Sequence, residues 1–414
     1  MDVLQEALNK ATAELPALFL QNLISRKLHE KGITPPKGLS QKMAEHFLAG
    51  NRGPFRFDGC NLPKTVRLTF TKADAEQIEQ AIDRFCTSLL PKIIQGVARR
   101  TATSVLKDLK SRWSNEHTRQ EEDLSGFRER LEDRWSKPLG QLRMLLTMVR
   151  EWCQEAHERE ASRKKTQNEQ FRGILIRLLV RACQVTDEII CLLENGFADG
   201  AMARWRTLHE LAVVAAIISQ HGESIAERYV AHQAVESKKA MDKYLACYKQ
   251  VGYKPLPVRA QKKILRNYDK AIVLYGNSFK SDYGWAAAHL GKDRPTFADL
   301  EAAAGRAQMR SHYQLGNDNV HAGIKSIFVR LGLLEDYSAL LAGRSNAGLT
   351  EPGQNAALTL AQLAVLVCMK EPNFDDLVVG QMMVTLQDEI PQSFYHADKR
   401  LRRDDKEVLR ERSK

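Results

Sequence analysis

Apolar residues recur at helical spacing along almost all of this 414-residue chain, and alternating strand patterns are nearly absent. The most apolar part lies between Phe171 and Gln220 and contains an unbroken apolar run from Leu211 to Ile218. This run is far shorter than the roughly 20 residues that a membrane-spanning helix needs. We therefore predict an all-α protein with minimal β structure, in which an N-terminal helical region precedes a larger helical bundle.

Length and charge distribution predict how the chain is divided. With 43% hydrophobic residues, the chain has enough apolar side chains for two or three domains. The charged stretch from His157 to Gln170 is typical of a linker or exposed helix, so we place a boundary near residue 165. We predict an N-terminal region over 1–165, a helical core domain over 166–397, and a charged tail over 398–414 with 8 basic and 5 acidic residues.

The N-terminal region contains one segment that resembles a strand and several that resemble helices. The glycines and prolines between Gly50 and Pro63 predict a loop, and residues 66–71 (VRLTFT) alternate weakly, as a short strand would. Thr71, with an acid three residues later, predicts the capped start of a helix that continues to about Cys153. Within it, Arg99 to Lys137 has 10 basic and 8 acidic residues, which is typical of a solvated helix or helical hairpin.

Turn residues divide the core domain into further helices. A helix from Phe171 to Leu193 should end at Asn195-Gly196, because glycine favours the left-handed conformation that terminates helices. The later apolar patterns predict helices over 199–220, 223–250, 296–315 and 320–333, a loop over 316–319, and a last helix near Ala357.

The first residues and the cysteines indicate a soluble cytoplasmic protein. The opening MDVLQEALNK has no long apolar core, so no signal peptide is expected. The 7 cysteines are scattered and contain no CxxC pair, so we interpret them as buried apolar residues in a reducing compartment. We expect no membrane partner.

The first candidate functional feature is Arg206-Thr-Leu-His-Glu210. Arg206 and Glu210 are four residues apart, so they share one helix face, which continues into the apolar run. Burial of a lone charge is costly, which predicts that the two side chains pair. The pair either holds packed helices together or forms part of a polar site, and the neighbouring His209 could be exposed.

A second candidate is Gly316-Asn-Asp-Asn-Val-His321-Ala-Gly323. If an apolar helix starts here, His321 lies beside free backbone N–H groups that attract anions such as phosphate. Histidine can transfer protons near neutral pH. The alternative is that Asn317 or Asn319 caps the helix and His321 is a core histidine.

The third candidate is the basic segment from Ser237 to Asn267, which accounts for +8 of the chain's formal net charge of +11. Its single acid is Asp242, and Tyr244, Tyr248 and Tyr253 are interleaved as base stacking would require. The basic residues are Lys238, Lys239, Lys243, Lys249, Lys254, Arg259, Lys262, Lys263 and Arg266. RNA or single-stranded nucleic acid and a plain solvated face are both compatible with this pattern.

The chain lacks the sequence motifs of several enzyme classes. It contains no GxxxxGK[ST] phosphate loop, no GxGxxG after a strand, no HExxH and no GxSxG. No E-x-x-H pair suggests a metal site on a helix. We therefore expect no metal and no cofactor.

The stretch from about Phe171 to Leu333 resembles the bacterial helical family catalogued as domain of unknown function 5677. The resemblance rests on LLENGFADGAMARWRTLHEL, on the Tyr229-Val-Ala-His232 step and on YQLGNDNVHAG. It implies an all-helical fold that gathers Arg206, Glu210 and His321 around one polar site, with His232 as a fourth member ahead of His209.

The resemblance also implies a setting in phage defence or stress response and a similarity to HEPN ribonucleases. Those enzymes use an R-x(4–6)-H motif without metal, normally across a dimer. Here Leu315 and Gln314 occupy the positions six and seven before His321, and Arg310 is too far away, so Arg206 would have to supply the cation.

Two hypotheses follow. In the first, the protein cleaves RNA without metal: His321 transfers a proton, Arg206 stabilises the phosphate and Glu210 holds Arg206. In the second, the protein is a non-catalytic nucleic-acid-binding or protein-interaction module, and Arg206, Glu210 and His321 belong to a structural network.

Overall fold

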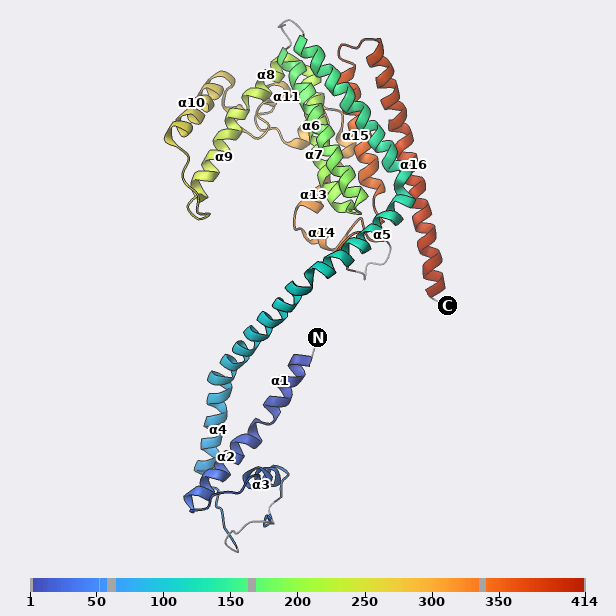
Figure 1. Cartoon of the computed structure of the whole chain (residues 1–414). Helices are drawn as coiled ribbons and strands as arrows, with labels where there is room; N and C mark the ends of the chain where they lie inside the picture. The colour runs from blue at the N-terminus through green and yellow to red at the C-terminus, as the bar shows by residue number, and fades with distance from the viewer. Residues whose placement is uncertain (1–2, 52, 58–64, 163–168, 335–339, 413–414) are drawn as a thin grey trace. The chain divides into compact units, whose positions relative to one another are not determined.

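A computed structural model describes residues 3–51, 53–57, 65–162, 169–334 and 340–412 (Figure 1). These residues form helices, turns and irregular segments and contain no strand, which confirms the all-α prediction. They divide into two compact units, which we name unit 1 (residues 1–120) and unit 2 (residues 121–414). The helix α5 (Leu90–Ser162) extends through the division. The boundary predicted near residue 165 falls outside the described residues and stays a prediction.

Unit 1 has a small core. It contains α1 (Val3–Ala13), α2 (Leu15–Glu30), α3 (Leu39–Leu48), α4 (Lys72–Arg84), a π-helical turn η1 (Phe85–Leu89) and the beginning of α5. The predicted capping box begins α4: the Thr71 N–H donates to Asp74 Oδ2 at 2.7 Å, and the Asp74 N–H donates to Thr71 Oγ1 at 3.3 Å. Lys27 of α2 lies 2.7 Å from Asp74, and this contact lowers the pKa of the Asp74 carboxyl to about 2.

The predicted strand over residues 66–71 is wrong. Among the described residues this segment pairs with no strand, and its alternating side chains Val66, Leu68 and Phe70 pack on the core of unit 1. The alternation of apolar and polar residues therefore arises because one side of this segment is buried, and it does not indicate a sheet.

Unit 2 is built around α7. It contains the remainder of α5 and the elements α6 (Glu169–Glu194), α7 (Ala198–His221), α8 (Glu223–Ala231), α9 (Gln233–Cys247), α10 (Val258–Tyr275), η2 (Asn277–Lys280), α11 (Ala287–Leu290), α12 (Phe297–Ala303), η3 (Ala307–Met309), α13 (Arg310–Val320), α14 (Ile324–Phe328), α15 (Thr350–Cys368) and α16 (Phe374–Arg412). The apolar run lies in α7, which packs against α6, α13 and α15, and residues such as Trp205 and Val213 are completely buried. In Figure 1, α9 and α10 form a hairpin that projects from the side of this bundle.

The predicted helix stop at Gly196 is confirmed. Gly196 has φ +73°, and a Cβ atom there would lie 2.5 Å from the Phe127 ring and 2.7 Å from the Ser345 carbonyl oxygen. Only glycine combines this backbone conformation with such close packing.

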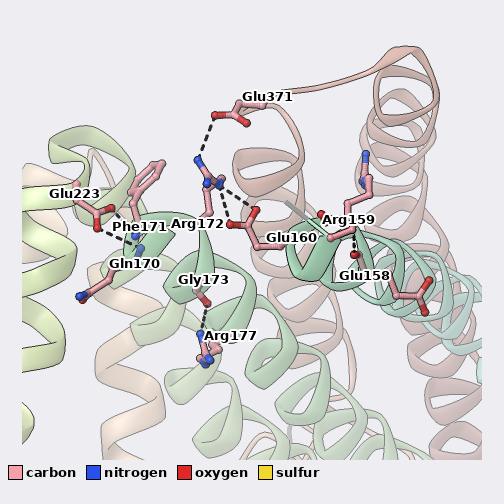
Figure 2. Close-up of polar contacts among 11 residues, drawn as sticks. Glu158, Arg159, Glu160, Gln170, Phe171, Arg172, Gly173, Arg177, Glu223 and Glu371 are labelled. Atoms are coloured by element: carbon pink, nitrogen blue, oxygen red, sulfur yellow. Dashed lines mark hydrogen bonds and ion pairs between the residues drawn. The ribbon is translucent and has the colours of Figure 1, made fainter. Parts of the chain in front are cut away.

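Ion pairs join the end of α5 to neighbouring helices (Figure 2). Arg172 at the start of α6 lies between two carboxylates: its Nε is 3.0 Å from Glu160 Oε2, and its Nη1 is 3.8 Å from Glu371 Oε1. The Glu223 carboxylate of α8 accepts from the backbone N–H of Phe171 at 2.8 Å and of Gln170 at 3.2 Å. A carboxylate is favoured at this position because the first N–H groups of a helix lack partners within the helix.

Several predicted helix boundaries in unit 2 are wrong. The helix expected over 223–250 breaks at His232 into α8 and α9, and the helix expected over 296–315 breaks near Gly305, which has φ +68°. The expected loop over 316–319 is helical, and of the helix expected over 320–333 only α14 is present. α15 begins at Thr350 rather than near Ala357, and the charged residues 398–412 continue α16.

The six cysteines among the described residues are free thiols. Cys153, Cys183 and Cys368 are buried, as predicted, but Cys86, Cys191 and Cys247 are exposed. Within the described ranges, no helix is long and apolar enough to cross a bilayer.

Candidate functional site

Arg206 and Glu210 pair on α7, as their spacing predicts. The Arg206 Nε lies 3.0 Å from Glu210 Oε1, and the Tyr313 hydroxyl of α13 donates to the same carboxylate oxygen at 2.7 Å. The guanidinium carbon of Arg206 lies 5.0 Å from the centre of the Tyr313 ring. The two charged side chains are 27% and 34% exposed, so this group lies at the edge of the bundle.

The charges and protons of this group stabilise one another. Burial alone would lower the pKa of Arg206, but Tyr313 and Glu210 raise it overall. Burial raises the pKa of Tyr313, and its hydrogen bond to Glu210 raises it further, so the phenol keeps its proton. The carboxylate is thus occupied by a cation and a phenol, which is typical of a structural network.

Gly316 brings α13 close enough to α7 for this contact. A Cβ atom at Gly316 would lie 3.3 Å from the Arg206 Cβ and 3.3 Å from the Met202 carbonyl oxygen. Glycine here serves helix packing instead of the turn that its polar neighbours suggested.

A second polar group, which the sequence did not reveal, lies in the core beside the first. His209 and Glu301 are 0% and 1% exposed, and His209 Nε2 lies 2.9 Å from Glu301 Oε1. Arg310 donates to the other Glu301 oxygen at 2.6 Å, and the His209 ring stacks on Trp205 with centroids 5.2 Å apart. The expectation that His209 could be exposed is wrong.

His209 is held as a neutral imidazole. Burial lowers its pKa, although Glu301 opposes this shift. We assign the proton to Nε2, which then donates to Glu301. Among the described residues, Nδ1 has no hydrogen-bond partner, so a second proton on this ring would be buried without an acceptor.

The other two candidate histidines lie outside this pair of groups. His321 is the exposed residue that follows the last turn of α13, so the prediction that it begins an apolar helix is wrong. A helix C-terminus disfavours anions, which removes the argument for a phosphate site there. Among the described residues, no hydrogen bond or ion pair joins the His321 side chain to Arg206 or Glu210.

His232 is buried between α8 and the segment after η2. Its Nε2 donates to the Ser281 carbonyl at 3.0 Å, its ring packs edge-on against Phe279, and Glu236 lies 3.7 Å from Nδ1. Burial lowers the pKa of His232. Its contacts therefore place it in a separate structural cluster.

The basic segment forms the α9–α10 hairpin. Two of its cations are paired: Lys238 lies 2.5 Å from Asp242, and Lys239 lies 2.6 Å from Asp282. The other seven are exposed, and none has a carboxylate within 4.0 Å among the described residues: Lys243, Lys249, Lys254, Arg259, Lys262, Lys263 and Arg266. Lys270, which follows the segment counted in the sequence, is also exposed on α10.

The three interleaved tyrosines differ in their availability. Tyr244 and Tyr248 stack with centroids 6.1 Å apart, and the Tyr244 hydroxyl donates to the Lys254 carbonyl, so this pair holds the hairpin loop. Tyr253, at the tip, is 65% exposed. Only Tyr253 offers a largely open ring to a base.

The structure indicates no metal centre among the residues it describes: no three His, Cys, Asp or Glu side chains are grouped to hold an ion.

Comparison with known proteins finds a family that matches part of the chain. Residues 172–338 match the Family of unknown function (DUF5677), which confirms the resemblance inferred from the motifs. No curated protein and no solved structure matches the chain. The matched segment contains both polar groups and the basic hairpin.

Proposed function

We propose that this chain, through its segment similar to DUF5677, is a cytoplasmic nucleic-acid-binding protein that takes RNA or another single strand on the α9–α10 hairpin. The observation that supports the proposal most strongly is the group of seven exposed cations, none of which has a carboxylate partner in the described part of the chain. Cations in this state keep their full charge for phosphates and release condensed counterions when they bind. The exposed Tyr253 ring supplies a face for one base.

The two polar groups have a structural role in this proposal. Arg206 pairs with Glu210, whose carboxylate also accepts from Tyr313, and His209 is enclosed, so we assign neither group a role in proton transfer. They fix α12 and α13 against α7, and α8 connects the same bundle to the hairpin.

Salt dependence tests the binding. We expect the affinity for a labelled single-stranded oligouridine, measured by fluorescence anisotropy, to fall steeply with salt. The logarithmic slope should be about −5 if all seven cations contact phosphates, at about 0.7 per contact. Changing Lys254, Arg259 and Lys262 to Gln should reduce its magnitude by about 2.

The matched control changes Lys399, Lys406 and Arg410 to Gln. These three exposed cations of α16 also have no carboxylate within 4.0 Å among the described residues, and their loss lowers the net charge equally. The control should leave the slope within about 0.5 of wild type if binding is local to the hairpin. A flat salt response, or equal effects of the two triple variants, would contradict the proposal.

Catalysis by Arg206, Glu210, His321 and His232 is the alternative. It predicts that the purified protein degrades RNA in the presence of a chelator and that Arg206→Ala and His321→Ala abolish the degradation. We expect intact RNA with all three proteins. Activity that only the wild type shows would establish the catalytic function instead.

A further inference from the structure

Two buried cysteine thiols meet where α5 packs against α6. Cys153 and Cys183 are 5% and 4% exposed, both line the same pocket, and their contact shifts the pKa of both thiols. The residues lie on different helices, so their proximity depends on the packing of unit 2.

Both thiols line one surface pocket. Its wall also includes Arg150 and His157 of α5, and the exposed side chains Gln154 and Gln184 form part of its rim. Both residues therefore border an opening at the surface, although little of either residue is exposed.

The surroundings make Cys183 the more acidic thiol. Contact with the Cys153 thiol lowers the pKa of Cys183 against the effect of burial, and the nearby Arg150 guanidinium lowers it further. The same contact, together with burial, raises the pKa of Cys153. Arg150 also pairs with Asp187 at 2.9 Å, which weakens but does not remove its effect on the thiol.

We propose that Cys153 and Cys183 are a redox-sensitive dithiol that hydrogen peroxide converts reversibly to a disulfide between α5 and α6. The Cys183 thiolate attacks one peroxide oxygen, the O–O bond breaks, and the hydroxide released takes a proton to become water. The product is a sulfenic acid on Cys183. The Cys153 sulfur then attacks the Cys183 sulfur, the S–O bond breaks, and a second water leaves with the Cys153 proton. Two thiols thus lose two electrons, which reduce one peroxide to two waters.

This modification does not depend on the proposed nucleic-acid binding. In a reducing cytoplasm, disulfides are mostly transient and serve catalysis or redox sensing. The bond would link two helices of the main bundle covalently, so oxidation should raise the melting temperature of unit 2.

The test uses the full-length chain with the exposed Cys86, Cys191 and Cys247 changed to Ser. After treatment with hydrogen peroxide, peptide mass spectrometry should find the peptide around Cys153 cross-linked to the peptide around Cys183, and dithiothreitol should release it. Cys153→Ser should abolish the cross-link and leave a sulfenic acid on Cys183 that dimedone labels. If both residues stay reduced, or become oxidised only singly, the proposal is overturned.

Arg150→Gln keeps the test decisive if a cysteine variant fails to fold, because Arg150 is on the surface. Removing this cation should slow formation of the cross-link roughly threefold, the effect of a rise of half a unit in the pKa of Cys183. Arg177→Gln is the matched control, since Arg177 lies outside the pocket and donates to the Gly173 carbonyl (Figure 2). Equal rates for wild type, Arg150→Gln and Arg177→Gln would show that the pocket does not activate Cys183.

Discussion

Both units are largely helical, but they bury very different amounts of apolar side chain. The core of unit 2 contains several large side chains with no exposure, among them Trp135, Trp205 and Phe394, while the buried apolar core of unit 1 is small and centres on Ile24 and Leu28. In the part of α5 that belongs to unit 1, large apolar residues remain about half exposed: Ile93 45%, Val97 47%, Val105 52%, Leu109 56% and Trp113 55%. The comparison shows that amphipathic spacing predicts a helix, whereas burial needs neighbouring helices that pack alongside it.

The difference between the two cores should have its largest effect on the unfolding free energy that is lost when a core side chain is truncated. Trp205→Ala should cost about 3–5 kcal/mol of unfolding free energy, because the surrounding helices of unit 2 cannot collapse into the space and the Asn355 carbonyl and Thr359 hydroxyl lose the indole N–H donor. Leu28→Ala should cost about 2 kcal/mol, since a thin core relaxes more easily. Urea denaturation followed by circular dichroism measures both.

We expect two separate unfolding transitions, one for each unit. Trp205→Ala should shift only the transition of unit 2, and Leu28→Ala only that of unit 1. Equal losses from Trp205→Ala and Leu28→Ala would contradict this difference between the units, because they would show that the core of unit 1 is as rigid as that of unit 2.

Acid should lower the stability of the two units over different pH ranges, and the loss should be smaller than that caused by truncating a core side chain. Burial lowers the pKa of His209, His232 and His289 in folded unit 2, so unfolding binds protons and stability falls as the pH drops below about 6.5. Each histidine contributes up to about 1.4 kcal/mol per pH unit. In unit 1, the pKa of Asp74 is lowered to about 2, so the stability from this carboxylate is lost only between its ordinary value of 3.8 and 2.

The measurement is the unfolding free energy of each transition from pH 7.5 to 5. His209→Asn should flatten the pH dependence in unit 2 and leave that of unit 1 unchanged. If the unfolding free energy of unit 1 depended more steeply on pH than that of unit 2, the pH dependence could not be assigned to the buried histidines of unit 2.

The distinction between spacing within one helix and packing between helices also explains which parts of the candidate site could be predicted from the sequence. The pairing of Arg206 with Glu210 followed from i,i+4 spacing within one helix, and the stop at Gly196 followed from the conformational preference of glycine. The contacts of Glu301 with His209 and Arg310 join residues on three elements, and no local spacing encodes such a meeting.

The segment around Gly316 shows how packing overrides local signals. Gly-Asn-Asp-Asn has the composition of a turn, yet close contact with α7 keeps it helical, so α13 ends four residues after Gly316. His321 therefore follows the end of a helix although the sequence suggested the beginning of one.

The smallest expected effect compares two glycines of α5, one in each unit. Gly96 and Gly140 both lie inside the helix, and a Cβ atom added at either position meets nothing within 4 Å. Alanine at either site should therefore favour the helix by about 0.5–1 kcal/mol. Because residues near Gly96 make no side-chain hydrogen bond or ion pair outside α5 among the described residues, we expect opening there to be local. Gly96→Ala should then raise amide exchange protection about threefold around residue 96 alone.

Gly140 lies next to the buried Leu139 and Leu142, where amides exchange through larger openings of unit 2. Gly140→Ala should therefore raise protection across α5 and α6 together, by a similar factor. Hydrogen exchange read by mass spectrometry separates these patterns. A response to Gly96→Ala that spreads through α5 into unit 2 would mean that the helix opens as one cooperative element, and the contrast between the units would not hold along α5.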